Sequence, residues 1–170
     1  MDTFKEQLVR KLPEKNDQIK KLLIIFASCL LAVFCFLFFM GSSLSIFGVV
    51  LAGGVIYGGY YLITNLIVEY EYILTNGELD IDKIVAQRSR KRLATLKLAS
   101  AVEFGTADGN LRVSPNETLI QASGNDANQD DYFIRLNHPS LGNTILIFTP
   151  SEEMLELVKN CLPRNLRNGR

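Results

Sequence analysis

The uncharged stretch LLIIFASCLLAVFCFLFFM, residues 22–40, decides the fold class of this chain. As an α-helix its 19 residues would extend about 28 Å, close to the ~30 Å hydrocarbon core of a bilayer. A polar break is followed by a second uncharged run, LSIFGVVLAGGVIYGGYYLI, at 44–63. We therefore expect transmembrane helices at 22–40 and 44–65, joined by an external turn at 41–43.

The charged residues all lie outside this part of the chain. The 170 residues include 18 Lys+Arg and 18 Asp+Glu, and none of these lies between residues 22 and 68. A neutral net charge argues against a nucleic-acid-binding protein, which normally carries a basic excess. The remaining residues suffice for one small domain. This pattern excludes a simple soluble globule and predicts a protein integral to the lipid bilayer.

A cleaved signal peptide is the alternative interpretation of the first apolar run. Its apolar region would have about 7–15 residues, whereas this run is longer and a second one follows directly. Two spans put both termini on one side of the membrane. Basic residues precede the first span and are absent from the turn, which predicts a multi-pass cell-membrane protein with both termini cytoplasmic. These basic residues are Lys5, Arg10, Lys11, Lys15, Lys20 and Lys21.

The second apolar run contains the sequence Gly54-x-x-x-Gly58. Small residues at this spacing allow membrane helices to approach closely. We expect Gly54 and Gly58 to pack against the first helix, where Ser28 and Ala32 offer a matching small face. Association with a second copy through the same glycines is the alternative, and the motif alone does not decide between them.

Residues 1–21 are predicted to form a cytoplasmic amphipathic segment. Phe4, Leu8 and Leu12 recur at every fourth position, with charged residues between them. This spacing predicts a short helix that ends before Pro13. Such a helix would lie on the inner leaflet or pack against the cytoplasmic domain.

From residue 68 the pattern is typical of β-strands, and we expect a cytoplasmic domain at 68–163 followed by a tail at 164–170. Polar and aromatic residues alternate at 69–72, and the apolar Ile73 and Leu74 follow. The Asn-Gly pair at 76–77 is a strong signal for a tight hairpin turn. The return strand alternates from residue 78. Its phase changes at the adjacent Ile84 and Val85, which predicts a bulge there.

Five further strands and one helix are expected in the rest of the domain. A third strand should run from about 91 to 102, with shorter strands at 111–114, 118–122, 132–137 and 144–149, and with polar loops at 105–110 and 123–131. Ser151 is a suitable N-cap for a closing helix that Pro163 should terminate. The apolar spacing predicts that Leu155 and Val158 are buried.

Seven short antiparallel strands followed by a C-terminal helix resemble the pleckstrin-homology-like (PH-like) fold. The sequence YEYILTNGEL at 70–79, followed by RSRKRL at 88–93, is similar to bacterial members of that superfamily. The chain as a whole resembles a family of small Gram-positive membrane proteins with two spans and one PH-like domain. This resemblance implies a membrane helical hairpin followed by a mainly-β, seven-stranded antiparallel barrel with a C-terminal helix. It carries over no catalytic or ligand-binding residue.

The sequence offers little for catalysis, cofactors or metals. His138 is followed by Pro139, which favours a turn residue over a general base. Cys29, Cys35 and Cys161 are expected to be free buried thiols, and no short Cys/His spacing suggests zinc. We therefore expect a protein that is not an enzyme, with no catalytic residue, no metal site and no cofactor.

Two functional hypotheses remain. The first is a membrane-anchored interaction or scaffold module whose barrel binds a protein partner, for example by strand addition. The second is a sensor of anionic lipid headgroups at the inner leaflet that uses a basic turn. The hairpin geometry would return the second strand toward the membrane and place the turn near it, although pairing with Asp80, Asp82 or Glu69 would neutralise the same residues. The basic turn consists of Arg88, Arg90, Lys91 and Arg92.

Overall fold

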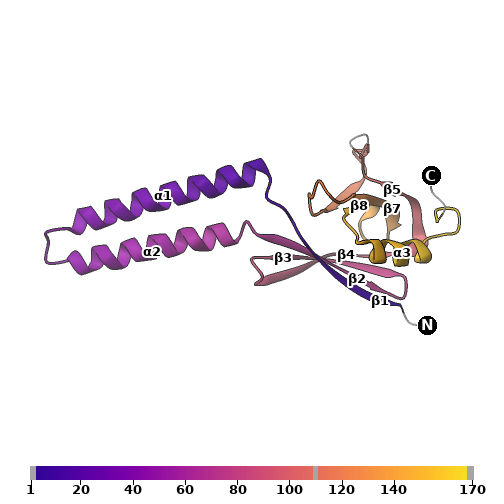
Figure 1. Ribbon diagram of the computed structural model, residues 1–170, viewed down its shortest axis with the longest axis horizontal. Helices are drawn as coiled ribbons and strands as arrows, with labels where there is room; N and C mark the ends of the chain where they lie inside the picture. Colours follow the sequence, from indigo (N-terminus) through magenta and orange to yellow (C-terminus); the bar gives the residue numbers. More distant parts are fainter. Residues whose placement is uncertain (1–2, 109–110, 168–170) are drawn as a thin grey trace. The chain divides into compact units, whose positions relative to one another are not determined.

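The structure is a computed structural model that describes residues 3–108 and 111–167 in two compact units (Figure 1). One unit, residues 13–67, is a helical hairpin. The other unit combines the residues before the hairpin with those from Val68 onward. The expected domain at 68–163 is therefore incomplete without the N-terminal segment, and the hairpin is an insertion within the β-domain.

The hairpin consists of α1 (Lys15–Phe39) and α2 (Ser45–Thr64). Both helices are long and apolar enough to cross a membrane, judged by length and composition. The first helix begins at Lys15, before the apolar run, because nothing between Pro13 and residue 22 interrupts a helical pattern. The loop that joins the helices consists of residues 40–44 and includes the predicted turn at 41–43.

Gly48 and Gly59 provide the close approach between α1 and α2. A Cβ atom at Gly59 would lie 2.2 Å from Oγ of Ser28, and one at Gly48 would lie 2.7 Å from Cβ of Phe39. A Cβ at Gly54 or Gly58 would meet nothing within 4 Å. The prediction that Gly54 and Gly58 pack within the hairpin is therefore wrong, because these residues lie on a different face of α2.

The N-terminal segment is the strand β1 (Phe4–Arg10) and not the predicted amphipathic helix. It pairs antiparallel with β2 (Val68–Thr75) along its whole length. A spacing of four residues satisfies both the helical period and the two-residue period of a strand, so the apolar pattern could not distinguish them. Val9 is buried, while Phe4 and Leu8 lie on the opposite, exposed side.

Sheet A has the order β1-β2-β3-β4, with β3 at Glu78–Val85 and β4 at Ser89–Lys97. The predicted Asn-Gly turn joins β2 to β3, and both of its residues have positive φ, 49° for Asn76 and 86° for Gly77. The register shift lies between Ile81 and Asp82. The bulge predicted at Ile84 and Val85 is therefore wrong in position, because the extra residue is Leu93 on β4 and the pairing at Ile84 and Val85 is regular.

Sheet B has the order β5-β7-β8-β6, and β6 pairs with β8 in parallel. Its strands are β5 (Ala101–Thr106), β6 (Thr118–Ala122), β7 (Tyr132–His138) and β8 (Gly142–Phe148). The predicted seven-stranded antiparallel barrel is wrong, because the described residues form eight strands in two open sheets.

The predicted number of strands is wrong for three reasons. One is the strand β1, which was predicted as a helix, and the other two are local. The predicted third strand is divided by the 3-10 turn η1 (Leu98–Ser100), which leads the chain from sheet A into sheet B. Residues 111–114 form no strand. The predicted loop at 105–110 overlaps the end of β5, and positions 109 and 110 lie outside the described residues.

The helix α3 (Glu152–Cys161) closes the core between the two sheets. The backbone N–H of Met154 donates to the side chain of Ser151, which confirms the predicted N-cap. Met154, Val158 and Leu162 are fully buried. Leu155 is only half-buried, so the prediction that it is buried is wrong; the buried residue is its neighbour Met154.

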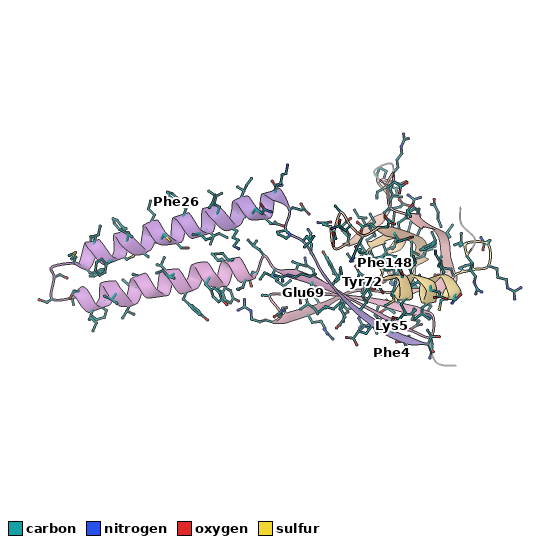
Figure 2. All side chains as sticks on the ribbon, in the orientation of Figure 1. Phe4, Lys5, Phe26, Glu69, Tyr72 and Phe148 are labelled. Carbon is teal, nitrogen blue, oxygen red and sulfur yellow. The ribbon has the colours of Figure 1, made fainter. Side chains whose placement is uncertain are left out.

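A buried polar network ties the sheets together. The hydroxyl of Tyr72 on β2 donates to the carbonyl of Ala122 and accepts from the backbone N–H of Thr149. Its ring meets that of Phe148 edge to face, with centroids 5.7 Å apart, and both side chains are labelled in Figure 2. Burial raises the pKa of the Tyr72 phenol, so it stays a neutral donor. The network fixes β2 against β6 and β8.

Candidate functional site

Both connections to the helical hairpin leave sheet A at the same end. The N–H of Lys11 donates to the carbonyl of Val68 over 2.9 Å, and Arg10 is paired with Glu69. Val68 is also paired with Val85, so the turn between β3 and β4 lies at this end too. We call this part of the sheet, made of residues 10–11, 68–69 and 85–89, the insertion end.

The turn at the insertion end has an unusual backbone. Ala86 and Gln87 both have positive φ, at 54° and 56°. This conformation is unfavourable for residues with a Cβ, by about 1–2 kcal/mol each. Strain of this kind is often retained where a turn has a function. Arg88 lies in the turn itself and is exposed.

Arg90 and Arg92 lie on the outer side of sheet A, away from the core, in contact with carboxylates. Nη2 of Arg90 lies 2.7 Å from each carboxylate oxygen of Glu71. Arg92 forms two bonds to Asp82, the shorter of 2.7 Å, and lies 2.7 Å from Oδ2 of Asp80. Two of the four residues in the predicted basic turn are therefore neutralised within the sheet.

Glu71 is the most perturbed carboxylate on this outer side. Only 4% of the residue is exposed, although it faces away from the core. Burial raises the pKa of Glu71, a side-chain hydrogen bond with Glu6 raises it further, and the charge of Arg90 opposes both. Glu71 thus interacts with the exposed Glu6 and Arg90 on the outer side of sheet A.

Lys91 lies on the other side of the sheet from Arg90 and Arg92. It is paired with Lys83, which in turn is paired with the buried Tyr70. Lys83 is not among the predicted basic residues, because the predicted cluster lies along one strand only. The sequence does contain a signal for Lys83. It and Lys91 are equally distant along the chain from the centre of the β3–β4 turn, so an antiparallel hairpin pairs them.

The edge of β1 that faces away from β2 is open. The bonds at Thr3 and Lys11 show that the odd-numbered residues of β1 form the ladder to β2. The N–H and C=O groups of Phe4, Glu6 and Leu8 therefore point to the free edge, and no described residue in 3–108 or 111–167 bonds to them. Such an edge can accept a further strand.

A groove of about 290 Å³ runs beside the second half of this edge. One wall is residues 7–10 of β1, and the other is the loop that begins at Gly124. The N–H of Leu12 donates to the carbonyl of Gly124 over 2.8 Å. A Cβ at Gly124 would lie 2.8 Å from Cγ1 of Val9, so a larger residue here would require the Val9 side chain to shift. Asp126 and Gln129 give this wall polar side chains.

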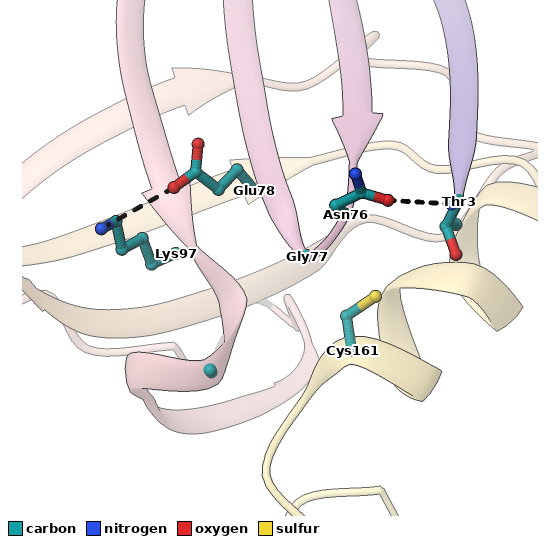
Figure 3. Close-up of a pocket in the computed structure, with 7 residues that line it drawn as sticks. Thr3, Asn76, Gly77, Glu78, Lys97 and Cys161 are labelled. Atoms are coloured by element: carbon teal, nitrogen blue, oxygen red, sulfur yellow. Dashed lines mark hydrogen bonds and ion pairs between the residues drawn. The ribbon is translucent and has the colours of Figure 1, made fainter. Parts of the chain in front are cut away.

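A second cavity, of about 500 Å³, lies at the opposite end of sheet A (Figure 3). Its side chains include Asn76, which accepts from the N–H of Thr3, and Lys97, which lies 3.7 Å from Glu78. Cys161 of α3 borders the cavity. Burial raises the pKa of the Cys161 thiol, which disfavours the reactive thiolate.

The remaining candidate residues have structural contacts. Nε2 of His138 lies 3.1 Å from the carbonyl of Thr95, and its Nδ1 accepts from the backbone N–H groups of Ser140 and Leu141. Asp131 accepts from Ser123 and Thr149, which anchors the loop at 123–131. Within the described residues no three His, Cys, Asp or Glu side chains are grouped to hold a metal ion.

Comparison with known proteins gives one match. The model of a protein family described as "Bacterial PH-like domain (DUF6106)" matches residues 1–168. The matched range includes β1 and the helical hairpin as well as the strands after it. No curated protein matches the chain.

Proposed function

Because the chain belongs to the DUF6106 family of bacterial PH-like domains, we propose that it is a membrane-anchored, non-enzymatic interaction module. The helical hairpin would be its anchor, as in the two-span Gram-positive proteins that the sequence resembles. The PH-like domain would lie on the cytoplasmic side of the cell membrane and bind a protein partner there. The observation that carries this proposal is the insertion of an apolar hairpin between two paired strands.

This insertion limits the ways in which the hairpin could cross a membrane. β1 and β2 are hydrogen-bonded neighbours, so the residues before and after the hairpin must be on the same side. A hairpin in which both helices cross the membrane satisfies this condition, whereas a single crossing does not. Cleavage of α1 as a signal peptide would also remove β1 from sheet A. The basic residues that precede α1 favour the cytoplasm as the side of the domain.

The open edge of β1 supports binding of an extended peptide segment. Backbone groups at Phe4, Glu6 and Leu8 are available for a new ladder, which supplies affinity without requiring a particular sequence. Exposed Phe4 and Leu8 would contact alternate side chains of the added strand. The groove beside Gly124 would receive its end.

Cysteine labelling in intact cells tests the anchoring. The variant would replace Cys29, Cys35 and Cys161 with Ala, and would carry a single cysteine at Ser43 in the loop or at Ser100 in the domain. A membrane-impermeant maleimide should label the Ser43→Cys protein in intact cells and the Ser100→Cys protein only after lysis. Labelling of the Ser100→Cys protein in intact cells would contradict a cytoplasmic domain.

Proline substitution tests the strand-addition surface. The N–H of Leu8 points to the free edge, so Leu8→Pro should block an added strand while leaving the ladder to β2 intact. Leu8→Ala is the matched control. A photoreactive residue at position 6 should crosslink a partner in native membranes of the Leu8→Ala protein and not of the Leu8→Pro protein. Equal crosslinking in both would exclude β1 as the docking edge.

Recognition of anionic lipid is the second candidate function. Arg88 lies in the insertion end, and Lys91 lies two residues beyond it on β4. The pairing of Val85 with Val68 and with Ser89 brings this turn to the end of sheet A where the chain connects to the proposed anchor. Arg90 and Arg92 already have carboxylate partners, so a lipid-facing role for them would need those ion pairs to open. A sensor that used this turn would depend on other basic residues nearby.

A further inference from the structure

A row of paired residues crosses sheet A near the insertion end, on the side that faces the core. The row runs from Val9 to Tyr70, then to Lys83 and finally to Lys91. Val9 and Tyr70 are buried, Lys83 is half-buried and Lys91 is exposed. The row therefore begins in the hydrophobic core and ends with two lysines at its margin.

Two lysines directly opposite each other are unfavourable on neighbouring strands. Side chains in this relation have Cβ atoms about 4.5–5.5 Å apart, and like charges there are destabilising. Across residues 3–108 and 111–167, neither Lys83 nor Lys91 forms an ion pair or a side-chain hydrogen bond. Arg90 and Arg92, on the other side of the same strands, are fully paired. The lysine pair is therefore an uncompensated positive site.

The bulge at Leu93 creates this arrangement. Before the bulge Ile81 is paired with Ala94, and after it Asp82 is paired with Arg92. If Leu93 were paired regularly with Asp82, Arg92 would lie opposite Lys83 and Lys91 opposite Ile84. The bulge thus directs the two arginines to the acidic outer side and brings the two lysines together. Bulges commonly redirect side chains in this way beside functional sites.

We propose that Lys83 and Lys91 bind the phosphate group of an anionic phospholipid. Each ammonium group has three donors and no acceptor, so a phosphate oxygen between them would satisfy both. This inference rests on the proposed membrane anchor, because Tyr70 of the same row lies three residues along the chain after the hairpin ends at Ile67. Lys11 lies on the same side of the sheet, one row nearer the hairpin. Lipid is chosen over free phosphate for that reason.

Amine acylation of the full chain in nanodiscs tests the site. Lys97 is the internal control, since it is exposed on the same strand but at the opposite end. Lys83 and Lys91 should be acylated more slowly in phosphatidylglycerol discs than in phosphatidylcholine discs, while Lys97 should react equally in both. Protection by inorganic phosphate in phosphatidylcholine discs, without protection by phosphatidylglycerol, would overturn the assignment to lipid.

Lipid retention measured by native mass spectrometry gives a second readout. Lys83→Gln and Lys91→Gln should each reduce retained phosphatidylglycerol roughly five-fold, as expected for one basic residue near an anionic surface. Arg90→Gln should have little effect. If Arg90→Gln reduces retention as much as Lys91→Gln, or neither lysine variant reduces it, the two-lysine site is excluded. If the chain does not enter nanodiscs at all, the membrane anchor itself is wrong.

Discussion

β1 should be essential for the β-domain, although it is separated from the other strands by the whole helical hairpin. The test compares two soluble proteins. In the first, residues 3–11 are joined to residues 68–170 through an Asn-Gly turn that replaces the hairpin. In the second, residues 68–170 stand alone. The join is feasible because Lys11 and Val68 are already hydrogen-bonded neighbours.

The contacts of β1 give the size of the expected difference. Burial of Val9 contributes about 1.5–3 kcal/mol. Each ladder bond to β2 contributes about 0.5–1.5 kcal/mol net. The side chain of Gln7 donates to the carbonyl of Thr149 and accepts from the N–H of Ser151, which fixes β1 to the start of α3. Together these contacts amount to on the order of 5–8 kcal/mol, comparable with the total stability of a domain of this size.

The joined protein should therefore unfold cooperatively, and the shorter fragment should be unfolded or aggregated. Circular dichroism during heating and the dispersion of amide NMR signals would measure this. Glu6→Ala in the joined protein is the control, since Glu6 faces outward and its loss should have a small effect. A fragment of residues 68–170 with the same melting temperature as the joined protein would refute a structural role for β1.

Three further predictions concern the core, the outer side of sheet A and the hairpin, and each is measured on the full chain in detergent. Met154→Ala should cost about 2–5 kcal/mol of unfolding free energy, and Leu155→Ala clearly less, since only Met154 is fully buried; equal losses would contradict the position of α3. Burial raises the pKa of Glu71 above its ordinary 4.5, so the free energy of unfolding should decline as the pH rises from about 4.5 through the raised value. Glu71→Gln should flatten this dependence on pH. The same dependence on pH in the variant would argue against burial of this carboxylate. Gly59→Ala should weaken hairpin packing by about 1–3 kcal/mol, whereas Gly54→Ala should be neutral or stabilising by up to about 1 kcal/mol; the reverse order, in a titration with a denaturing detergent, would restore Gly54 as the packing residue.

Local signals in the sequence predicted several elements correctly. The Asn76-Gly77 turn requires positive φ at two successive positions, and few residue pairs other than Asn-Gly allow it. Ser151 caps α3 through a bond to a residue three positions later, a short-range interaction. The strand at 118–122 was placed correctly because polar residues bound it on both sides. Each of these features depends on residues that are close in the sequence.

Long-range pairing explains what the sequence predicted wrongly. The role of β1 depends on β2, and the spacing of Phe4, Leu8 and Leu12 fits a helix and a strand equally well. Which glycines pack in the hairpin depends on the rotation of α2 against α1, which the spacing of Gly54 and Gly58 does not fix. The parallel pairing of β6 with β8 likewise joins segments that no turn connects.

Composition and neighbouring residues suffice to specify two apolar helices, a β-rich domain, the tight turn and the capped final helix. How the basic residues are used depends on the pairing of distant strands. The bulge at Leu93 changes the register by one residue, and in a strand one residue reverses the side that every following side chain faces. For that reason Arg90 and Arg92 meet carboxylates on the outer side, while Lys91 meets Lys83 at the margin of the core.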